Sequence, residues 1–265
     1  SNVLLKGGVG ADLFNAVQSW VGHLPGGLGI ATIVSCAIFA AISGSSVATA
    51  ATIGTVAIKE MTDRGYSRPF ALGLLAAGGT LGILIPPSIP VIIYGVITEE
   101  SIVDLFRAGI VPGLILTALF VAYAVLRAKF GGGWQPEPRA DWPTRWAASR
   151  RAAPTLALAL VIVLGIYLGA FTPTEAAGVG FVLALAITLG LRRSLRLGDL
   201  LPIAQESART SAMILFIVAA ASVFGKALTL YRIPQEVTTL VIGNIASPEA
   251  FIAVICVMLL AMGCV

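Results

Sequence analysis

A run of glycines and prolines interrupts an apolar stretch that is otherwise long enough to cross a bilayer. The segment from Gly78 to Pro90 reads GGTLGILIPPSIP. Its three prolines remove backbone donors and clash with the preceding turn, and its glycines allow conformations that a helix interior does not use. Because unpaired peptide groups cannot face lipid, such a break must be buried in protein or line a wet cavity. The segment predicts a discontinuous membrane helix, the element that builds binding sites in many secondary transporters.

The composition points to an all-α polytopic membrane protein. The chain is 57% hydrophobic and 11% charged, whereas soluble domains carry about 25% charged residues. The basic residues lie in short loops between apolar runs, so the net charge of +4 indicates membrane topology rather than a nucleic-acid partner. HExxH, P-loop, GxSxG and DxD motifs are absent from the sequence, which argues against an enzyme and against ATP-driven transport by this chain.

A second interruption divides an uncharged stretch that runs from Gly27 to Ile58. The cluster Ser43-Gly44-Ser45-Ser46 leaves two arms, each shorter than the roughly 20 residues of a full span. This pattern predicts a re-entrant helical hairpin with a polar tip near the bilayer midplane.

Charge and apolar patterning together predict the order of segments. We expect these elements: 1–26, interfacial amphipathic helix; 27–61, re-entrant hairpin; 69–97, discontinuous transmembrane helix; 98–130, amphipathic segment and transmembrane helix; 131–153, cytoplasmic loop; 154–232, three transmembrane helices of a second repeat; 233–265, amphipathic helix and the first arm of a truncated second hairpin.

The distribution of basic residues predicts the orientation. Placing loops 59–68, 127–151 and 192–196 in the cytoplasm collects 12 of the 17 Lys and Arg there. The first hairpin then enters from the cytoplasmic face and the arm from Pro248 enters from the opposite face. A shift of 222 residues also aligns the elements of 12–41 with those of 234–263, which favours an inverted-topology repeat.

Three groups of residues are candidates for chemistry. At the hairpin tip, hydroxyls and freed carbonyls suit Na⁺, while the following helix N-terminus suits a carboxylate; the competing interpretation is that small residues only allow close helix packing. In the break, Thr80 and Ser88 supply side chains. In the turn 171–176, we expect Thr174 to cap a helix and Glu175 to favour its dipole, with ion coupling as the alternative for this acid.

Four motifs in this order resemble the large membrane subunit of tripartite ATP-independent periplasmic (TRAP) transporters: SGSSVATAATIG (43–54), GGTLGILIPPSIPVIIYG (78–95), TEESIVDLFRAGIVPG (98–113) and FTPTEAAGVG (171–180). The resemblance implies an inverted-repeat, elevator-type fold in the bacterial inner membrane. It also implies Na⁺-coupled import of a small organic acid, with no cofactor. The implied partners are a periplasmic substrate-binding protein and a small four-helix membrane subunit.

The resemblance assigns residues to sites. Those implied for Na⁺ are Ser43, Gly44, Ser45, Ser46, Gly79, Thr80, Gly82 and Pro86. Those implied for the substrate are Ser45, Ser46, Thr49, Thr80, Pro87 and Ser88. The chain stops at Val265, where we expect the second hairpin tip to begin, so it is expected to be a fragment with half of the site.

Other functional classes stay open at this point. The alternatives are an ion channel and a secondary carrier that is independent of a binding protein. An intramembrane hydrolase with Ser45 as nucleophile is less favoured, because no His or Lys near it completes an activated-nucleophile pattern.

Overall fold

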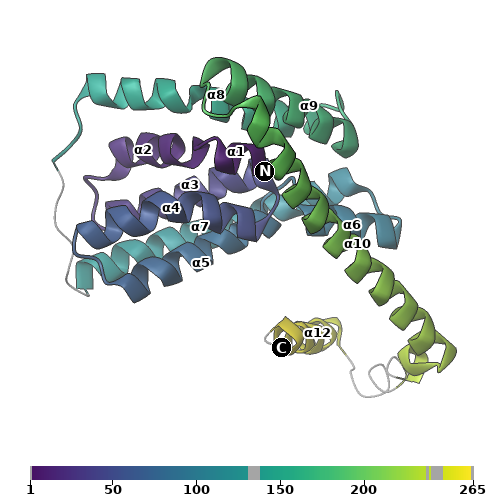
Figure 1. Ribbon diagram of the computed structural model, residues 1–265. Helices are drawn as coiled ribbons and strands as arrows, with labels where there is room; N and C mark the ends of the chain where they lie inside the picture. Colours follow the sequence, from purple (N-terminus) through teal and green to yellow (C-terminus); the bar gives the residue numbers. More distant parts are fainter. Residues whose placement is uncertain (1, 131–137, 237–238, 240–246, 264–265) are drawn as a thin grey trace. The chain divides into compact units, whose positions relative to one another are not determined.

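The computed structural model describes residues 2–130, 138–236, 239 and 247–263, and every regular element in these ranges is helical (Figure 1). The chain divides into two units, Ser1–Ala204 and Gln205–Val265. The elements are α1 (Asn2–Lys6), α2 (Val9–Val21), α3 (Gly27–Ser43), α4 (Ser46–Asp63), α5 (Arg68–Leu84), α6 (Ile89–Thr98), α7 (Ile102–Phe130), α8 (Trp142–Tyr167), α9 (Pro173–Leu185), the π-helical turn η1 (Ala186–Leu191), the 3-10 turn η2 (Leu197–Asp199), α10 (Leu200–Leu230) and α12 (Pro248–Gly263).

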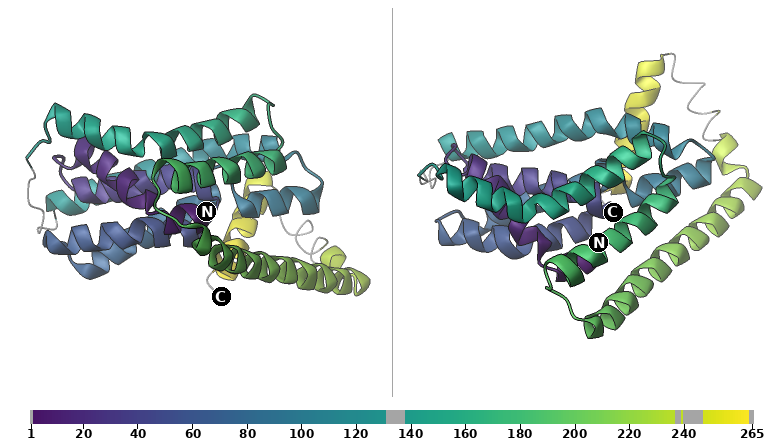
Figure 2. Two further views of the ribbon diagram at one scale, coloured as in Figure 1. Left: turned by 45° about the horizontal axis from the view of Figure 1, so that its top comes forward. Right: turned by 90° about the horizontal axis from the view of Figure 1, so that it is seen from above.

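Helix α3 is the centre of the first unit. It packs against α2, α4, α5, α7 and α8, and the views in Figures 1 and 2 show these helices around it. Small residues bring the helices close: a Cβ on Gly29 would lie 3.0 Å from both Ala124 of α7 and Leu74 of α5. Membrane helices associate through such close packing, because lipid offers no hydrophobic driving force between them.

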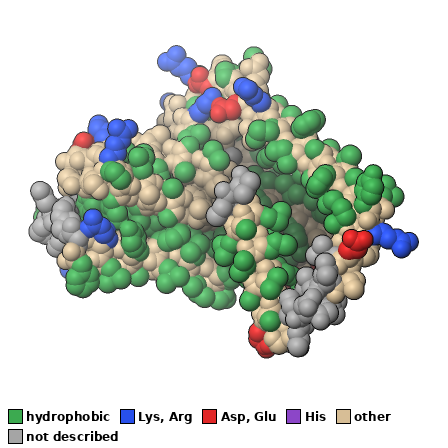
Figure 3. Space-filling model, turned by 90° about the horizontal axis from the view of Figure 1, so that it is seen from below, with side chains coloured by type: hydrophobic (Ala, Val, Ile, Leu, Met, Phe, Trp, Pro, Cys, Tyr) green, Lys and Arg blue, Asp and Glu red, His purple; other side chains and the backbone are tan. Residues whose placement is uncertain are grey.

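Five segments of the described chain are long and apolar enough to cross a membrane. They are Arg68–Thr98, Ile102–Phe130, Trp142–Tyr167, Pro173–Leu191 and Leu197–Leu230. Hydrophobic side chains cover much of the face seen in Figure 3, and charged side chains form small separate groups. An apolar exterior of this kind fits lipid contact, as the composition predicts.

The N-terminal segment differs from the expected single interfacial helix. It forms two helices, and the apolar face of α2 packs against α3, α4 and α8, with Leu13 and Phe14 fully buried. Asp12 of α2 also pairs with Arg192, which follows η1. The amphipathic pattern is therefore satisfied by protein contacts inside the first unit.

The loop expected over 131–153 is shorter than predicted, because α8 already begins at Trp142. Pro143 in its first turn fits a helix start, where the missing N–H costs nothing. The tryptophans and arginines of 142–151 belong instead to the first turns of this helix. At the other end of the chain, α12 is a helix within the range expected for the arm of a second hairpin. Most of 237–246 lies outside the described residues, so the second hairpin and the repeat stay predictions.

Candidate functional site

The chain reverses direction in two residues between α3 and α4. Gly44 adopts the left-handed conformation at φ 60°, which glycine reaches without a steric penalty. Ser45 is extended, and its Oγ accepts a hydrogen bond of 3.3 Å from the Ala48 N–H. This N-cap satisfies one orphan donor of α4. The predicted tip at 43–46 is therefore a helix–turn–helix reversal, while its depth in a bilayer stays a prediction.

A network of hydroxyls closes the tip. Ser43 Oγ lies 2.9 Å from Thr49 Oγ1, and Thr49 Oγ1 donates to the Ser45 carbonyl at 2.8 Å. Ser43 and Thr49 are both buried. The tip thus gathers neutral oxygens in a low-exposure environment, which is the ligand type that hard monovalent cations accept.

The break between α5 and α6 occupies 85–88. Ser88 is fully buried, and its Oγ donates to the Ile83 carbonyl at 2.6 Å, a carbonyl in the last turn of α5 where orphan acceptors occur. The peptide bond between Pro86 and Pro87 is cis. The predicted discontinuous helix is therefore two helices, and the Ser88 hydroxyl satisfies one of the carbonyls left unpaired at the end of α5.

The tip and the break contact each other directly. The Ile89 N–H, at the start of α6, donates to the Gly44 carbonyl at 3.2 Å. A Cβ on Gly44 would lie 2.7 Å from the Pro87 carbonyl oxygen, and a Cβ on Gly82 would lie 2.5 Å from the Ser45 carbonyl oxygen. Only glycine fits at these two positions without displacing backbone, so the Ser-Gly tip and the Gly-Pro break form one structure.

The other residues expected at the site fall into two groups. Gly79 faces the start of α4, where its added Cβ would meet Ala50 at 3.0 Å and the Ser46 carbonyl at 3.3 Å. Pro86 is buried and lies against Gly109 of α7. Thr80, in contrast, is exposed and donates to the Ala77 carbonyl of its own helix at 2.7 Å. The structure does not bring Thr80 to the tip, because one step along a helix turns a side chain about 100° away from Gly79.

The N-cap of α9 is Thr172, and the prediction of Thr174 as the cap is wrong. Thr172 Oγ1 accepts from the Glu175 N–H at 3.3 Å, while the Thr172 N–H donates to Glu175 Oε2 at 2.9 Å. This is a capping box, and its Thr-x-x-Glu spacing is the sequence signal that identifies the correct cap. Glu175 serves the cap, and a coupling role for it stays a prediction.

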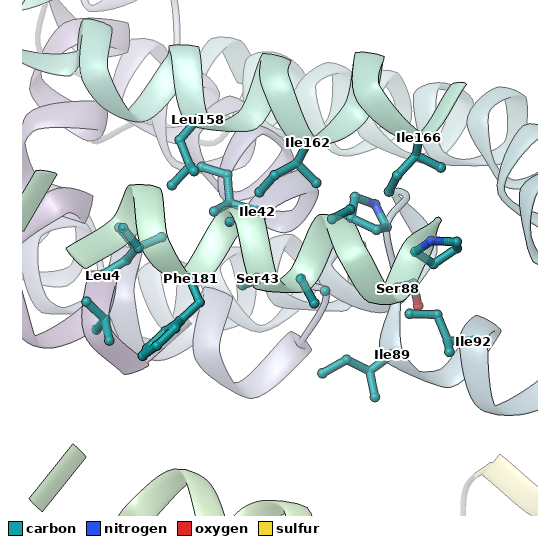
Figure 4. Close-up of a pocket in the computed structure, with 18 residues that line it drawn as sticks. Leu4, Ile42, Ser43, Ser88, Ile89, Ile92, Leu158, Ile162, Ile166 and Phe181 are labelled. Carbon is teal, nitrogen blue, oxygen red and sulfur yellow. The ribbon is translucent and has the colours of Figure 1, made fainter. Parts of the chain in front are cut away.

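A cavity of about 270 Å³ lies beside the tip and the break (Figure 4). Ser43, Gly44, Pro87 and Ser88 form one wall. Apolar side chains from elements distant in sequence also line it, among them Leu4 of α1; Leu158, Ile162 and Ile166 of α8; Phe181 of α9. Sequence reasoning missed these residues, because each looks like any other apolar helix residue until the helices are packed together.

Comparison with known proteins identifies the family. The family model described as "Tripartite ATP-independent periplasmic transporter, DctM component" matches residues 1–265. The C4-dicarboxylate TRAP transporter large permease protein DctM of Pseudomonas aeruginosa is 41% identical over 98% of this chain and 61% of its own length. The ectoine TRAP transporter large permease protein TeaC of Halomonas elongata is 37% identical over 97% of this chain and 60% of its own length.

A third relative has a compound name. The isethionate TRAP transporter permease protein DctMQ of Oleidesulfovibrio alaskensis is 37% identical over 97% of this chain and 40% of its own length. The chain thus spans less than two thirds of each of these three relatives. The match over the whole chain confirms the resemblance carried by the four motifs, and the chain belongs to the family of the DctM component of tripartite ATP-independent periplasmic transporters.

Proposed function

We propose that this chain is part of the large membrane subunit of a secondary transporter that imports a small organic acid together with Na⁺. The observation that carries the proposal is the direct contact of the tip and the break through Ile89 and Gly44. Interrupted helices that meet at membrane depth are the sites at which transporters of this kind hold ions and substrates.

The oxygens of the tip support Na⁺ as the coupling ion. Ser43, Thr49 and the Ser45 carbonyl lie within hydrogen-bond distance of one another, and in the described residues no group of three or more His, Cys, Asp or Glu side chains gathers to hold a metal. Hydroxyl and carbonyl ligands are neutral and hard, which suits a weakly bound monovalent cation better than a transition metal. Na⁺ bound there would hold the tip and the break in a single arrangement.

The walls of the cavity support an acidic substrate. Ser88 and Ile89, at the N-terminal end of α6, line it. Helix N-termini favour negative charge through their N–H groups and their dipoles. The names of the relatives, which mention C4-dicarboxylate, ectoine and isethionate, support a small polar metabolite and leave its identity open.

The proposed partners follow from the family. We propose a periplasmic binding protein that delivers the substrate and a small membrane subunit, and the compound name of the DctMQ relative supports the second. The proposed location is the bacterial inner membrane, with alternating access by an elevator movement. The five candidate spans support a multi-pass arrangement.

Uptake in proteoliposomes tests the proposal. The full-length permease, its small subunit and its binding protein are reconstituted with and without an inward Na⁺ gradient. We expect saturable accumulation that requires the gradient, and loss of this accumulation in Ser45→Ala and Pro87→Ala. Thr62→Ala is the matched control, because Thr62 is in the same helix as Ser46 and its hydroxyl donates to the Ile58 and Lys59 carbonyls of that helix.

The same preparation separates the alternatives. Accumulation that persists without the binding protein would favour an independent carrier. Unsaturable flux down a gradient would favour a channel. Uptake unchanged in both tip and break variants would contradict the assignment of the site.

A further inference from the structure

The first turns of α8 have an inward face that is fixed to α2. Arg145 is only 5% exposed, and its guanidinium lies 5.4 Å from the ring centroid of Trp20 and 6.0 Å from that of Trp142. Trp20 Nε1 donates to Ser149 Oγ at 3.0 Å. These cation–π and hydrogen-bond contacts hold this part of α8 in one rotational setting.

That setting turns a basic and aromatic groove outward. Pro143, Trp146, Ala147, Arg150 and Arg151 line a shallow groove of about 520 Å³. Trp146 is 71% exposed, and both arginines are exposed. Within the ranges that the structure describes, neither Arg150 nor Arg151 forms a salt bridge. The groove therefore presents two guanidinium groups beside an uncovered indole.

The length of α8 places this groove at the edge of a bilayer. The apolar part of the helix, from Ala152 to Tyr167, is about 24 Å long, which is shorter than the roughly 30 Å hydrocarbon core. A short apolar helix is accommodated by local thinning of the bilayer or by flanking side chains that snorkel. Arg150 and Arg151, just before Ala152, then reach toward the headgroup phosphates, at the level where Trp is enriched. Val161 and Leu164 continue the same helix face into the apolar region and are 40% and 45% exposed.

We propose that this groove binds the headgroup of an anionic phospholipid. Each guanidinium offers a planar pair of donors that matches phosphate oxygens, and the positive charge of the groove complements an anionic headgroup. The exposed apolar side chains below the groove provide a surface for acyl chains, which a free phosphate ion would not use. Lipid bound there stabilises the same turns of α8 that Arg145 attaches to α2.

Native mass spectrometry of the full-length permease with its small subunit tests the proposal. The complex is titrated with phosphatidylglycerol and, separately, with phosphatidylcholine. We expect preferential retention of phosphatidylglycerol, and about 30-fold weaker binding in Arg150→Gln/Arg151→Gln, since each basic residue near the membrane contributes about a factor of five. Arg150→Lys/Arg151→Lys keeps the charge but loses the planar donors, and we expect intermediate binding.

The matched control is Arg127→Gln/Lys129→Gln, which removes the same charge from exposed positions at the end of α7. We expect this variant to keep the preference for phosphatidylglycerol. Thermal unfolding without lipid checks that all variants fold. Equal retention of the two lipids, equal loss in the control, or competition by inorganic phosphate at matching concentration would overturn the proposal. Phosphatidylglycerol that binds the isolated permease but not the complex would also overturn the proposal, because the small subunit would then occupy the groove.

Discussion

Two interruptions of the helical chain look alike in sequence but differ in how their polar groups are satisfied. The turn before α9 contains Thr172, Pro173 and Glu175, and the hydrogen bonds of its capping box are all made within four residues. The tip at 43–46 also contains hydroxyls, but its Gly44 carbonyl is bonded to Ile89, which is 45 positions away. A local capping box is complete by itself, whereas the tip depends on a distant segment. Because of this dependence, we expect a ligand bound at the proposed site to change the structure at the tip rather than at the turn before α9.

The largest effect is expected at Gly82. An added Cβ would lie 2.5 Å from the Ser45 carbonyl oxygen, which is backbone, so Gly82→Ala forces the tip and α5 apart. We expect a loss of about 2 kcal/mol of unfolding free energy together with loss of transport. Gly73 of the same helix has nothing within 4 Å of its added Cβ, and Gly73→Ala is expected to stabilise by up to about 1 kcal/mol. Unfolding in detergent measures the unfolding free energy of both variants. Equal values for Gly82→Ala and Gly73→Ala would show that α5 does not need to approach the tip closely.

The hydroxyl pair of the tip is expected to show coupling. Thr49→Val removes the acceptor of the Ser43 hydroxyl and one donor to the Ser45 carbonyl, and we expect a cost of about 1.5 kcal/mol because the buried Ser43 hydroxyl loses its partner. In a double-mutant cycle with Ser43→Ala, the two changes should be non-additive by about 1 kcal/mol. Additive losses would mean that the two hydroxyls act independently.

The turn before α9 is expected to respond only in stability. Thr172→Ala removes the N-cap oxygen and should cost about 1 kcal/mol, while Thr174→Ala should cost close to nothing. Substrate uptake per folded molecule should stay unchanged in both. A change in the Na⁺ dependence of uptake in Thr172→Ala would contradict the view that this turn is a self-contained cap.

The smallest effect is expected at Thr80. Its hydroxyl bonds to its own helix on an exposed face, so Thr80→Ala should leave the Na⁺ dependence of uptake within about a factor of two, since exposed substitutions away from such features cost less than about 0.5 kcal/mol. Reduced apparent affinity for Na⁺ would restore the role implied by the family motif. Thr62→Ala again serves as the control, because it removes the same kind of intrahelical bond.

These cases show what sequence reasoning reached and where it stopped. The tip and the break were predictable because Gly, Ser and Pro act on the backbone at their own positions, whatever surrounds them. Other features depend on how the helices pack and on how each is rotated about its axis. These are the contact of Ile89 with Gly44, the cavity walls from Leu4 and Phe181, and the exposed position of Thr80. The start of α8 was missed for a related reason. The charge of Arg145 suggests a loop, and only the packed structure places its guanidinium beside the rings of Trp20 and Trp142.

The bond between Ile89 and Gly44 has a consequence for genetics. Donor and acceptor are both main-chain atoms, so a conventional alanine scan leaves this bond chemically intact at either position. Transport would be lost at Gly44 and Gly82 in such a scan because the added Cβ clashes with backbone. That loss would be misinterpreted as a packing defect. Replacing the Ile89 amide by an ester, through incorporation of the matching hydroxy acid, would delete this N–H donor while keeping every side chain; the Ser88 carbonyl, which accepts from the Ile92 N–H, would become a weaker acceptor. The site is encoded as much in the peptide backbone as in its side chains, and a mutational map restricted to side chains would underestimate it.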